Sequence, residues 1–365
     1  MQNCFKHRFN RCFIASAALV ALFAASSAAH AQQEIKITVS AGHAPVFLWV
    51  KHIKETMIPA INRELAKGGG GGKFKITWKE AYGGTLAKLG SELETIEQGV
   101  SDMGIVGSVF HPGKLPLQNV SYAAPFGPLD PRVISKVMNQ MHDTVPAMKK
   151  AWEKYNQSYL CGFGLDGYGV FAAAPLTRLE DLRGKKFGGA PTTHAWIKGS
   201  GAVAVAAGLP AFYNDVKAGV YNGVLVFPTG GVAAKLYEVA PVYTETGFGA
   251  MSAGGISINK GRWEKFPPEV RAAFKVGCDE YEAAYSKEQF VRAVAALDTI
   301  KANKGSVTSM PDAERLRLAK SIENPSIAWI AAATKSGFPA KEVLKAYMDG
   351  ARREGHKFPR DWDKE

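Results

Sequence analysis

The stretch Leu179-Glu180-Asp181-Leu182-Arg183-Gly184-Lys185-Lys186-Phe187-Gly188-Gly189-Ala190-Pro191 is the most informative part of the chain. It begins as a short helix or turn, passes through a glycine turn, and continues as a strand with a glycine-rich end. On both sides of it, predicted strands alternate with predicted helices. This alternation predicts α/β layers around a largely parallel sheet, and ligands of such sheets bind at the carboxyl ends of strands.

The strongest strand signal outside this stretch is residues 34–40, where polar and apolar side chains alternate. The segment after it carries Trp49, Ile53, Met57 and Ile61 at a spacing suited to one face of a helix. Further strands are predicted at 74–78, 103–110, 159–165, 169–173, 186–187 and 220–227, and helices at 89–99, 267–303, 311–333 and 340–353. The glycine run 68–72 is most simply a flexible loop.

The N-terminus predicts export. Lys6, Arg8 and Arg11 precede an apolar run at 12–25, and Ala29-His30-Ala31 offers small residues at the cleavage-specifying positions. These are the three parts of a secretory signal peptide, and the apolar run is shorter than the ~20 residues that span a bilayer. We therefore expect a signal peptide at 1–31, a mature chain that starts at Gln32, and a periplasmic protein that is not membrane-embedded after cleavage.

Composition excludes several classes of protein. With 365 residues, 46% of them hydrophobic and 21% charged, the chain suits a soluble globular protein with one large or two medium domains. The net charge is +12, but the basic residues form isolated pairs without a nucleic-acid-binding signature, so no nucleic acid partner is expected. Cys161 and Cys278 remain after the signal peptide, either as a disulfide or as two buried thiols.

Several segments, taken in order, resemble the solute-binding proteins of TRAP-type (tripartite ATP-independent periplasmic) transporters. They are A-Y-G-G-T-L at 81–86, the predicted helical segment at 92–103, A-P-F at 124–126, the stretch at 179–191 quoted above, G-V-Y-N-G at 219–223, and I-N-K-G-R-W with F-P-P at 258–268. The resemblance covers almost the whole mature chain. It implies a two-lobed α/β periplasmic-binding-protein (clamshell) fold with a hinge of crossing strands and a long helix across both lobes.

The resemblance also implies a domain organisation and a role. Lobe I is expected at 32–155, lobe II at 156–258, and C-terminal helices that span the lobes and return to lobe I at 259–365. The protein is expected to capture a small organic solute in the periplasm and deliver it to the membrane permease of a TRAP transporter. Neither a cofactor nor a metal is expected.

The family's substrate anchor is missing from this sequence. The family text L-E-D-L-K-G-L-K-I-R-V-P contains an arginine that clamps the carboxylate of an organic acid, and Gly188 stands at that position. A second family arginine, in G-x-R-x-F, aligns with Gly169. Three alternatives follow: a carboxylate held by other donors such as His43, Lys198 or backbone N–H groups; a neutral or aromatic solute; or a cation held by aromatic rings and Asp166. We favour an aromatic or otherwise hydrophobic solute, either an acid or a neutral compound.

The predicted ligand-binding residues are those that the resemblance places at the cleft. They are His43, Phe47, Ser108, Val109, Phe110, Phe126, Tyr168, Phe187, Gly188, Trp196, Tyr213 and Phe227. Each aromatic residue in this set is also typical of an ordinary hydrophobic core.

Catalysis is the rival class. The sequence contains no H-x-x-x-H, no C-x-x-C and no G-x-S-x-G, so it predicts neither a metal site nor a nucleophile elbow. We therefore expect a receptor and not an enzyme. The alternatives are an exported enzyme on the same two-lobed architecture and a subunit that presents its ligand to a membrane sensor.

Overall fold

The computed structural model describes residues 32–67 and 72–365. The predicted signal peptide at 1–31 and residues 68–71 of the predicted glycine loop lie outside the described residues. In the described part, nine strands form one sheet in the order β2-β1-β3-β8-β4-β7-β5-β6, with β9 paired to β8.

The strands are β1 (Gln33–Ser40), β2 (Phe74–Ala81), β3 (Met103–Gly107), β4 (Gln157–Ala172), β5 (Lys186–Gly189), β6 (Val203–Ala206), β7 (Gly223–Val226), β8 (Val242–Asn259) and β9 (Ser306–Ser309). The α-helices are α2 (Leu48–His52), α3 (Ile58–Leu65), α4 (Glu92–Glu97), α5 (Val120–Ala123), α6 (Pro131–Thr144), α7 (Pro146–Glu153), α8 (Leu209–Lys217), α9 (Pro228–Ala233), α10 (Lys260–Trp263), α11 (Pro268–Ala302), α12 (Asp312–Ser321), α13 (Pro325–Lys335) and α14 (Ala340–Arg353). A π-helix, η1 (Ile53–Met57), joins α2 to α3, and short 3₁₀ helices are η2 (Ser108–Phe110), η3 (Pro116–Asn119), η4 (Leu179–Leu182), η5 (Pro191–Trp196) and η6 (Leu236–Glu238).

The sheet consists of two parallel patches joined by an antiparallel centre. Strand β1 pairs in parallel with β2 and β3, and β5 pairs in parallel with β6 and β7. Between the patches, β8 pairs antiparallel with β3 and β4, and β4 pairs antiparallel with β7. The predicted parallel sheet is therefore correct for each patch, whereas the centre is antiparallel.

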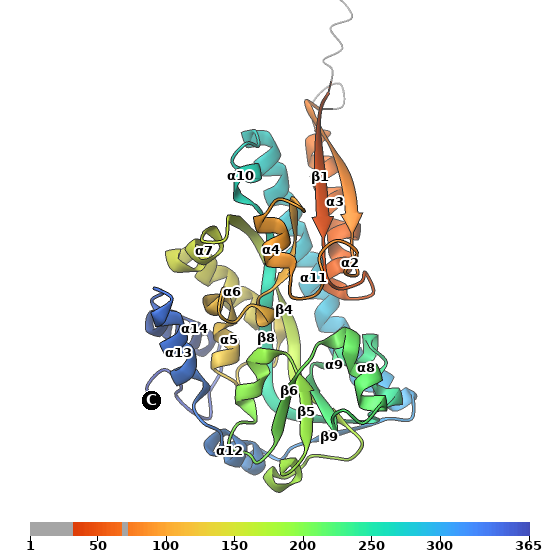
Figure 1. Ribbon diagram of the computed structural model, residues 1–365, viewed down its shortest axis with the longest axis vertical. Coiled ribbons are helices and arrows are strands. Elements are labelled where there is room, and N and C mark those ends of the chain that lie inside the picture. Colours follow the sequence, from red (N-terminus) through yellow and green to blue (C-terminus); the bar gives the residue numbers. More distant parts are fainter. Residues whose placement is uncertain (1–31, 68–71) are drawn as a thin grey trace, which may run out of the picture.

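Two lobes lie at the two ends of the long central strands (Figure 1). Strands β1 and β2 and helix α3 occupy the upper end, and β5, β6 and helices α8 and α9 occupy the lower end. Strands β4 and β8, of 16 and 18 residues, run through both lobes, and their register shifts at several points between Tyr159 and Val170. This confirms the two-lobed α/β fold with a hinge of crossing strands.

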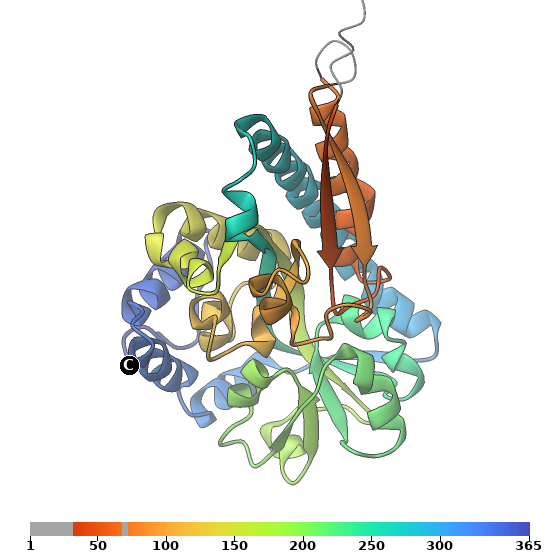
Figure 2. The same cartoon turned by 45° about the horizontal axis from the view of Figure 1, so that its top comes forward.

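Helix α11 spans both lobes, as expected. This helix of 35 residues packs against α3 and η1 on one side of the hinge and against α9 and β9 on the other (Figure 2). Its buried tyrosines also bond to the molecule's centre: the Tyr281 hydroxyl donates to the Trp49 carbonyl at 3.0 Å, and the Tyr285 hydroxyl donates to the Gly164 carbonyl at 2.8 Å. After α12, helices α13 and α14 pack against α5 and α6.

Some predicted boundaries differ from the structure for identifiable reasons. The predicted strands at 159–165 and 169–173 are one strand, β4, because residues 166–168 continue the strand across a register shift in its pairing with β8. The predicted helix at 311–333 is two helices, because Pro325 has no N–H to continue a helix and instead begins α13, where Asn324 accepts a bond from the Ser326 N–H at 2.9 Å. The predicted strand at 103–110 ends at Gly107 and continues as η2.

Candidate functional site

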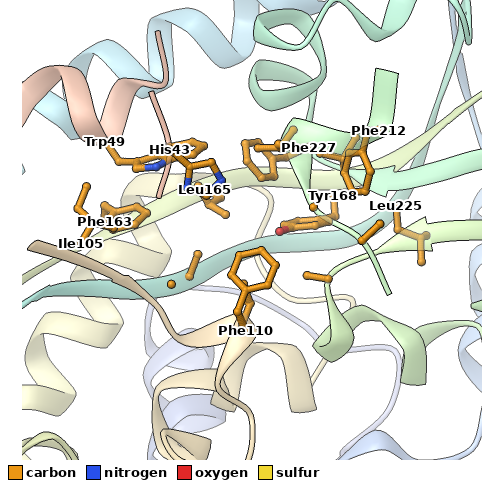
Figure 3. A pocket seen from close by; sticks show the side chains of 18 residues that line it. His43, Trp49, Ile105, Phe110, Phe163, Leu165, Tyr168, Phe212, Leu225 and Phe227 are labelled. Carbon is orange, nitrogen blue, oxygen red and sulfur yellow. The ribbon is translucent and has the colours of Figure 1, made fainter. Parts of the chain in front are cut away.

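A cavity lies between the two lobes, where parallel strands of both patches end. In the first lobe it is reached by the residues that follow β1 and β3, and in the second lobe by those that follow β5, β6 and β7. Its lining, shown in Figure 3, consists of His43, Trp49, Ile105, Gly107, Val109, Phe110, Phe163, Leu165, Tyr168, Ala190, Ala207, Gly208, Leu209, Phe212, Leu225, Val226, Phe227 and Ala253. The position agrees with the rule that open α/β sheets bind ligands at the carboxyl ends of their strands.

The cavity is bounded by a connected set of aromatic rings. Trp49 stacks on Phe163 with ring centres 6.0 Å apart, and Phe47 stacks on the indole at 5.1 Å from behind the lining. Phe227 meets Trp49 edge-on at 6.0 Å and Tyr168 at 5.2 Å, which joins the walls of the two lobes. Such rings provide apolar contact area with restricted geometry.

Three lining side chains among the described residues carry a polar group: those of His43 and Tyr168, and the indole N–H of Trp49. The His43 imidazole lies edge-on to Phe47 and Trp49, with each pair of ring centres 5.2 Å apart. Burial lowers the pKa of His43 to about 4, so the ring is neutral at pH 7. The Tyr168 hydroxyl lies 3.0 Å from the Tyr122 hydroxyl, and burial raises the pKa of Tyr168, so this hydroxyl also stays uncharged.

The position of the family's main arginine is filled by a tyrosine ring. A Cβ atom on Gly188 would lie 2.7 to 3.0 Å from three ring carbons of Tyr221, closer than side chains approach. The Tyr221 hydroxyl donates to the Asp215 carboxylate at 3.0 Å, which fixes the ring. Gly188 therefore packs closely against the Tyr221 ring and does not line the cavity.

The second arginine position is closed in the same way. A Cβ atom on Gly169 would lie 2.4 Å from the Thr244 carbonyl oxygen and 2.5 Å from the Tyr243 hydroxyl. The Tyr243 hydroxyl donates to the Gly167 carbonyl at 3.1 Å. Neither glycine has room for a side chain.

No other basic group replaces these arginines in the cavity lining of the described residues. Lys198 pairs with Glu323 at 2.7 Å and is largely exposed, and Arg183 is exposed beside the glycine turn.

Asp166, the acid considered for a cation, does not line this cavity. It lines a separate cavity together with Tyr243 and Phe290. Its carboxylate accepts bonds from the Thr229 N–H at 3.0 Å, the Thr229 hydroxyl at 2.6 Å and the Gln289 amide at 2.7 Å. Burial nonetheless raises the pKa of Asp166 to about 6.

Five of the twelve predicted ligand-binding residues meet at the cavity. They are His43, Val109, Phe110, Tyr168 and Phe227. Two others lie directly behind this lining: Phe47 supports Trp49 and His43, and the Ser108 hydroxyl donates to the Asn119 side chain at 2.8 Å.

The remaining predicted residues do not line the cavity, although the Trp196 ring meets the lining residue Tyr168 edge-on with ring centres 5.2 Å apart. Phe187 is fully buried in the core and Phe126 packs on Phe248. Trp196 stacks on Tyr122 with ring centres 5.5 Å apart and donates its indole N–H to the Tyr122 carbonyl at 2.9 Å. The Tyr213 hydroxyl donates to Glu238 at 2.8 Å on the outer side of α8, away from the cavity.

Sequence reasoning missed most of the second lobe's contribution. The lining residues not predicted are Trp49, Ile105, Gly107, Phe163, Leu165, Ala190, Ala207, Gly208, Leu209, Phe212, Leu225, Val226 and Ala253. For Phe212 the available signal was the apolar spacing of α8, in which Leu209 and Phe212 are buried whereas Tyr213 is only partly so. Ala207 to Leu209 follow β6, a strand of alternating Val and Ala without a clear strand signal.

Within residues 32–67 and 72–365, no group of three or more His, Cys, Asp or Glu side chains is arranged to hold a metal ion. Across the same residues, no helix combines the length and the apolar character that crossing a membrane requires.

The crossing strands, the helix shared by both lobes and a cavity between the lobes define a two-lobed solute-binding protein. The model of the bacterial extracellular solute-binding protein family 7 matches residues 63–325, and the chain belongs to this family, the solute-binding receptors of TRAP transporters. Receptors of this family are periplasmic and work with a membrane permease. The family and the structural relatives are binding proteins and not enzymes.

Solved structures support the fold. A marine metagenome TRAP solute-binding protein specific for aromatic acid ligands, in complex with 3-hydroxybenzoate, is similar with a TM-score of 0.75 and 19% identity over 88% of this chain and 99% of that chain. A TRAP solute-binding protein from Rhodoferax ferrireducens with copurified benzoate has a TM-score of 0.73 and 16% identity over 88% and 98% of the two chains. A marine metagenome protein specific for pyroglutamate has a TM-score of 0.74 and 20% identity over 88% and 99%.

Proposed function

We propose that this TRAP receptor captures a small solute with an aromatic or otherwise hydrophobic body and hands it to the permease. The observation that carries the proposal is the lining: of the eighteen described residues around the cavity, only His43, Tyr168 and Trp49 have polar side-chain groups, and rings from both lobes face the same space. Ligand sites commonly combine such apolar area with a few polar groups that fix orientation.

The size of the cavity supports a small ligand. The empty space amounts to about 550 Å³ only when the open solvent at its mouth is included. About 60 Å³ of it can hold the centres of water-sized molecules, several times the space that one water needs. A single substituted ring suits this volume better than a long chain or an oligosaccharide.

A thermal-shift screen tests the proposal. Aromatic acids, neutral aromatic compounds, short aliphatic dicarboxylates, polyols and amines are compared, and only compounds with an aromatic or hydrophobic body are expected to raise the melting temperature. Stabilisation by short aliphatic dicarboxylates alone would contradict the proposal.

Two adjacent residues of α8 provide a matched pair of variants. Phe212→Ala removes a ring that lines the cavity and is expected to weaken binding of the best compound from the screen about 10- to 100-fold, as the loss of a buried ring does. Tyr213→Ala removes a ring of similar size that bonds to Glu238 outside the cavity, and is expected to change affinity less than twofold. Circular dichroism checks that both variants are folded.

The enzyme alternative is separated by the fate of the ligand. A receptor returns its ligand unchanged, whereas an enzyme converts it, so chromatography after prolonged incubation distinguishes them. A subunit that presents its ligand to a membrane sensor is distinguished by the neighbouring genes: a large multi-span permease supports transport, and a receptor kinase supports sensing.

We further propose that residues 1–31 are removed on export. The proposal rests on the charged start, the short apolar run and the Ala29-His30-Ala31 sequence. Mass spectrometry of the protein recovered from the periplasm is expected to give Gln32 as the first residue. Retention of the N-terminal segment on the membrane would contradict it.

A further inference from the structure

We infer that this cavity selects an uncharged aromatic solute, with His43 and Tyr168 as its hydrogen-bonding groups, in place of the carboxylate that the family's arginines bind. The inference rests on the proposed function, because it assigns the charge of the solute that the same cavity takes. The solved relatives named above were found with acids, so the two kinds of ligand can be compared directly.

The cavity lining offers no positive charge to a carboxylate. None of the described residues that line the cavity is a lysine or an arginine. A carboxylate that enters it would lose its hydration without gaining a partner of opposite charge, and a buried carboxylate without such a partner is strongly disfavoured. An uncharged ring with a polar substituent loses far less hydration on entering the same space.

Tyrosine rings fill the space at both positions where the family has arginine. Tyr221 occupies the space above Gly188, and Tyr243 occupies the space above Gly169. Both rings are held by hydrogen bonds, to Asp215 and to the Gly167 carbonyl. An arginine could therefore not be restored at either place without displacing a fixed tyrosine, which distinguishes this cavity from an arginine site with a single missing side chain.

His43 offers the cavity an uncharged imidazole. Neither ring nitrogen has a hydrogen-bond partner among the described residues, although the ring packs against Phe47 and Trp49. The His43 ring lies beside Trp49 at the edge of the cavity (Figure 3). Burial is the cause that lowers its pKa to about 4, so at pH 7 the imidazole offers one N–H donor and one acceptor but no charge. These groups suit a hydroxyl, an amide or a carbonyl on the solute.

Tyr168 completes the polar side of the cavity. Its hydroxyl shares one hydrogen bond with the Tyr122 hydroxyl, so the pair retains further capacity to donate or accept. The ring centres of Tyr168 and Phe227 lie 5.2 Å apart. Tyr168 therefore supplies both a part of the aromatic wall and a hydroxyl group. A ring that packs on this wall can direct one polar substituent to His43 or Tyr168.

The test compares isosteric ligands that differ in charge. Isothermal titration measures binding of 3-hydroxybenzamide against 3-hydroxybenzoate, and of benzamide against benzoate, at pH 8. The amide of each pair is expected to bind at least 30-fold more tightly, with an affinity that is unchanged between pH 6 and pH 8. Titration in two buffers of different ionisation enthalpy is expected to show no proton uptake with the amides.

Variants separate the polar groups from a merely structural role. His43→Leu is expected to weaken amide binding about 5- to 30-fold, whereas His43→Gln, which keeps a donor and an acceptor, restores most of the affinity. Lys198→Ala serves as the control, because Lys198 was considered as an alternative anion donor yet lies outside the cavity lining, and it is expected to change neither series.

The outcomes are distinguishable. If acids bind as tightly as amides at pH 8 without proton uptake, the inference is overturned while the proposed function stands. An acid that binds only with the uptake of one proton supports the inference, because the complex is then uncharged. If no compound of either series binds and no other aromatic compound does, the proposed function fails and the inference falls with it.

Discussion

At the residue scale, the two glycines at the family's arginine positions differ from simple deletions. Each supports a buried tyrosine whose hydroxyl has a defined partner, so the glycine and the tyrosine form one packing unit. Two pairs of residues therefore exclude an arginine, Gly188 with Tyr221 and Gly169 with Tyr243. A glycine without such a tyrosine ring above it would leave a space that water and the carboxylate of a solute could occupy together.

This packing predicts that even a methyl group at Gly188 is costly. In Gly188→Ala the new Cβ would lie within 3.0 Å of the Tyr221 ring, so the ring must shift, and we expect a loss of about 1 to 3 kcal/mol in the free energy of unfolding. Urea unfolding measures it. Gly113→Ala is the control, because a Cβ atom there meets nothing within 4 Å, and its effect is expected to stay within about 0.5 kcal/mol. Equal effects of the two substitutions would contradict the proposed packing.

Asp166 predicts a pH dependence of stability. Its pKa is raised from the ordinary 3.8 to about 6, so the folded state holds a proton that the unfolded state releases. The stabilising contribution of this proton is complete below about pH 4 and is lost as the pH rises to about 6, a change of roughly 3 kcal/mol. His43 and His142, whose pKa values are lowered to about 4, oppose this trend over an overlapping range, because they favour folding as the pH rises.

Comparison with the Asp166→Asn variant isolates the contribution of Asp166 to the pH dependence of stability. As the pH rises from 4 to 6, we expect the unfolding free energy of the wild type to fall relative to that of Asp166→Asn. Urea unfolding at half-unit pH intervals measures it. A difference that is constant over this range would show that Asp166 does not carry the proton in the folded protein.

The candidate site was predictable at the loops next to clear strands and much less so elsewhere. His43 follows the alternating strand β1, and Val109 and Phe110 follow the apolar strand β3, so both could be placed at strand ends. The directions of the side chains could not be predicted: Phe212 and Tyr213 are neighbours in sequence, yet of the two only Phe212 faces the cavity. That choice is made by the tertiary packing of α8 against β7, which leaves a weak trace in a short helix.

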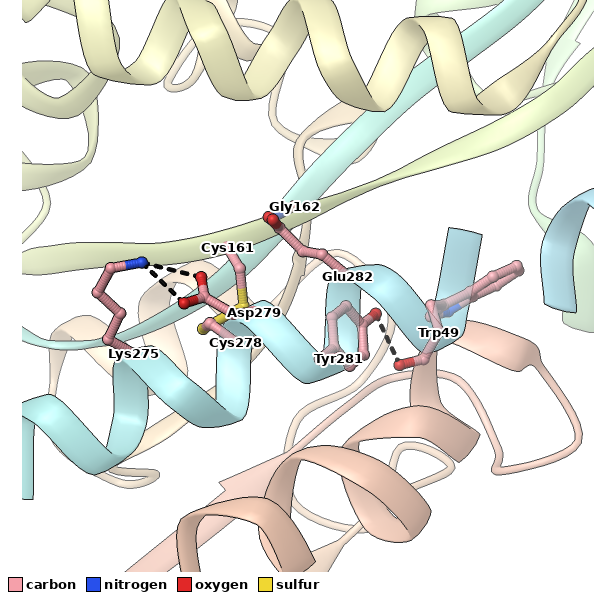
Figure 4. The surroundings of a disulfide bond; sticks show 8 residues. All are labelled: Trp49, Cys161, Gly162, Lys275, Cys278, Asp279, Tyr281 and Glu282. Atoms are coloured by element: carbon pink, nitrogen blue, oxygen red, sulfur yellow. Dashed lines mark hydrogen bonds and ion pairs between the residues drawn. A yellow bond between two sulfur atoms is a disulfide. The ribbon is translucent and has the colours of Figure 1, made fainter. Parts of the chain in front are cut away.

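At the element scale, the disulfide joins the hinge to the long helix. Cys161 on β4 and Cys278 on α11 form a disulfide across 117 residues of sequence, with both side chains buried (Figure 4). Nearby, the Gly162 N–H of β4 donates to the Glu282 carboxylate of α11 at 3.2 Å. The sequence left a disulfide and two free thiols equally open, because spacing along the chain carries no information about the distance between two strands or helices.

This disulfide is expected to stabilise the protein mainly by restricting the unfolded chain. For a loop of this length the chain-entropy model gives about 4 to 5 kcal/mol, and measured values are commonly about 2 to 4 kcal/mol. We expect the Cys161→Ala, Cys278→Ala double variant to lose about that much in guanidinium unfolding. The single variant Cys278→Ala with a reductant is expected to match it, and wild-type unfolding that is unaffected by a reductant strong enough to open the bond would contradict the expectation.

The central strands show where sequence patterns stop being informative. Strand β8 was not predicted at all, because its sequence is rich in glycine, alanine and serine and alternates apolar and polar residues clearly only at 256–259. Nearly all of its residues are buried, since sheet neighbours and helices cover both faces, and small residues permit this. Gly254, with φ +125°, could not carry a side chain, because a Cβ atom would lie 2.0 Å from the Val106 carbonyl oxygen. Such contacts depend on strands far apart in sequence.

At the scale of the whole molecule, the fold places the cavity between two bodies that share only β4, β8 and α11 as long connections. We propose that lobe I comprises residues 32–155, lobe II residues 156–258, and the C-terminal helices residues 259–365. Solute that contacts both walls favours the closed arrangement by its differential affinity for the two states. Aromatic rings from both lobes, Trp49 in the first and Phe227 in the second, already meet in this structure at 6.0 Å.

This arrangement predicts that a bound solute draws the lobes together. Spin labels at Lys75→Cys on β2 and Lys217→Cys on α8, both exposed, report the distance between the lobes while the buried disulfide stays intact. Addition of the tightest-binding compound from the screen is expected to shorten and narrow the distance distribution in pulsed electron paramagnetic resonance. A pair within the first lobe, Lys75→Cys with Lys54→Cys, is the control and is expected to stay constant. If the inter-lobe distance is unchanged at saturating solute while Phe212→Ala still weakens binding, the cavity binds solute without closure, and recognition by the permease must then depend on a surface that the solute does not rearrange.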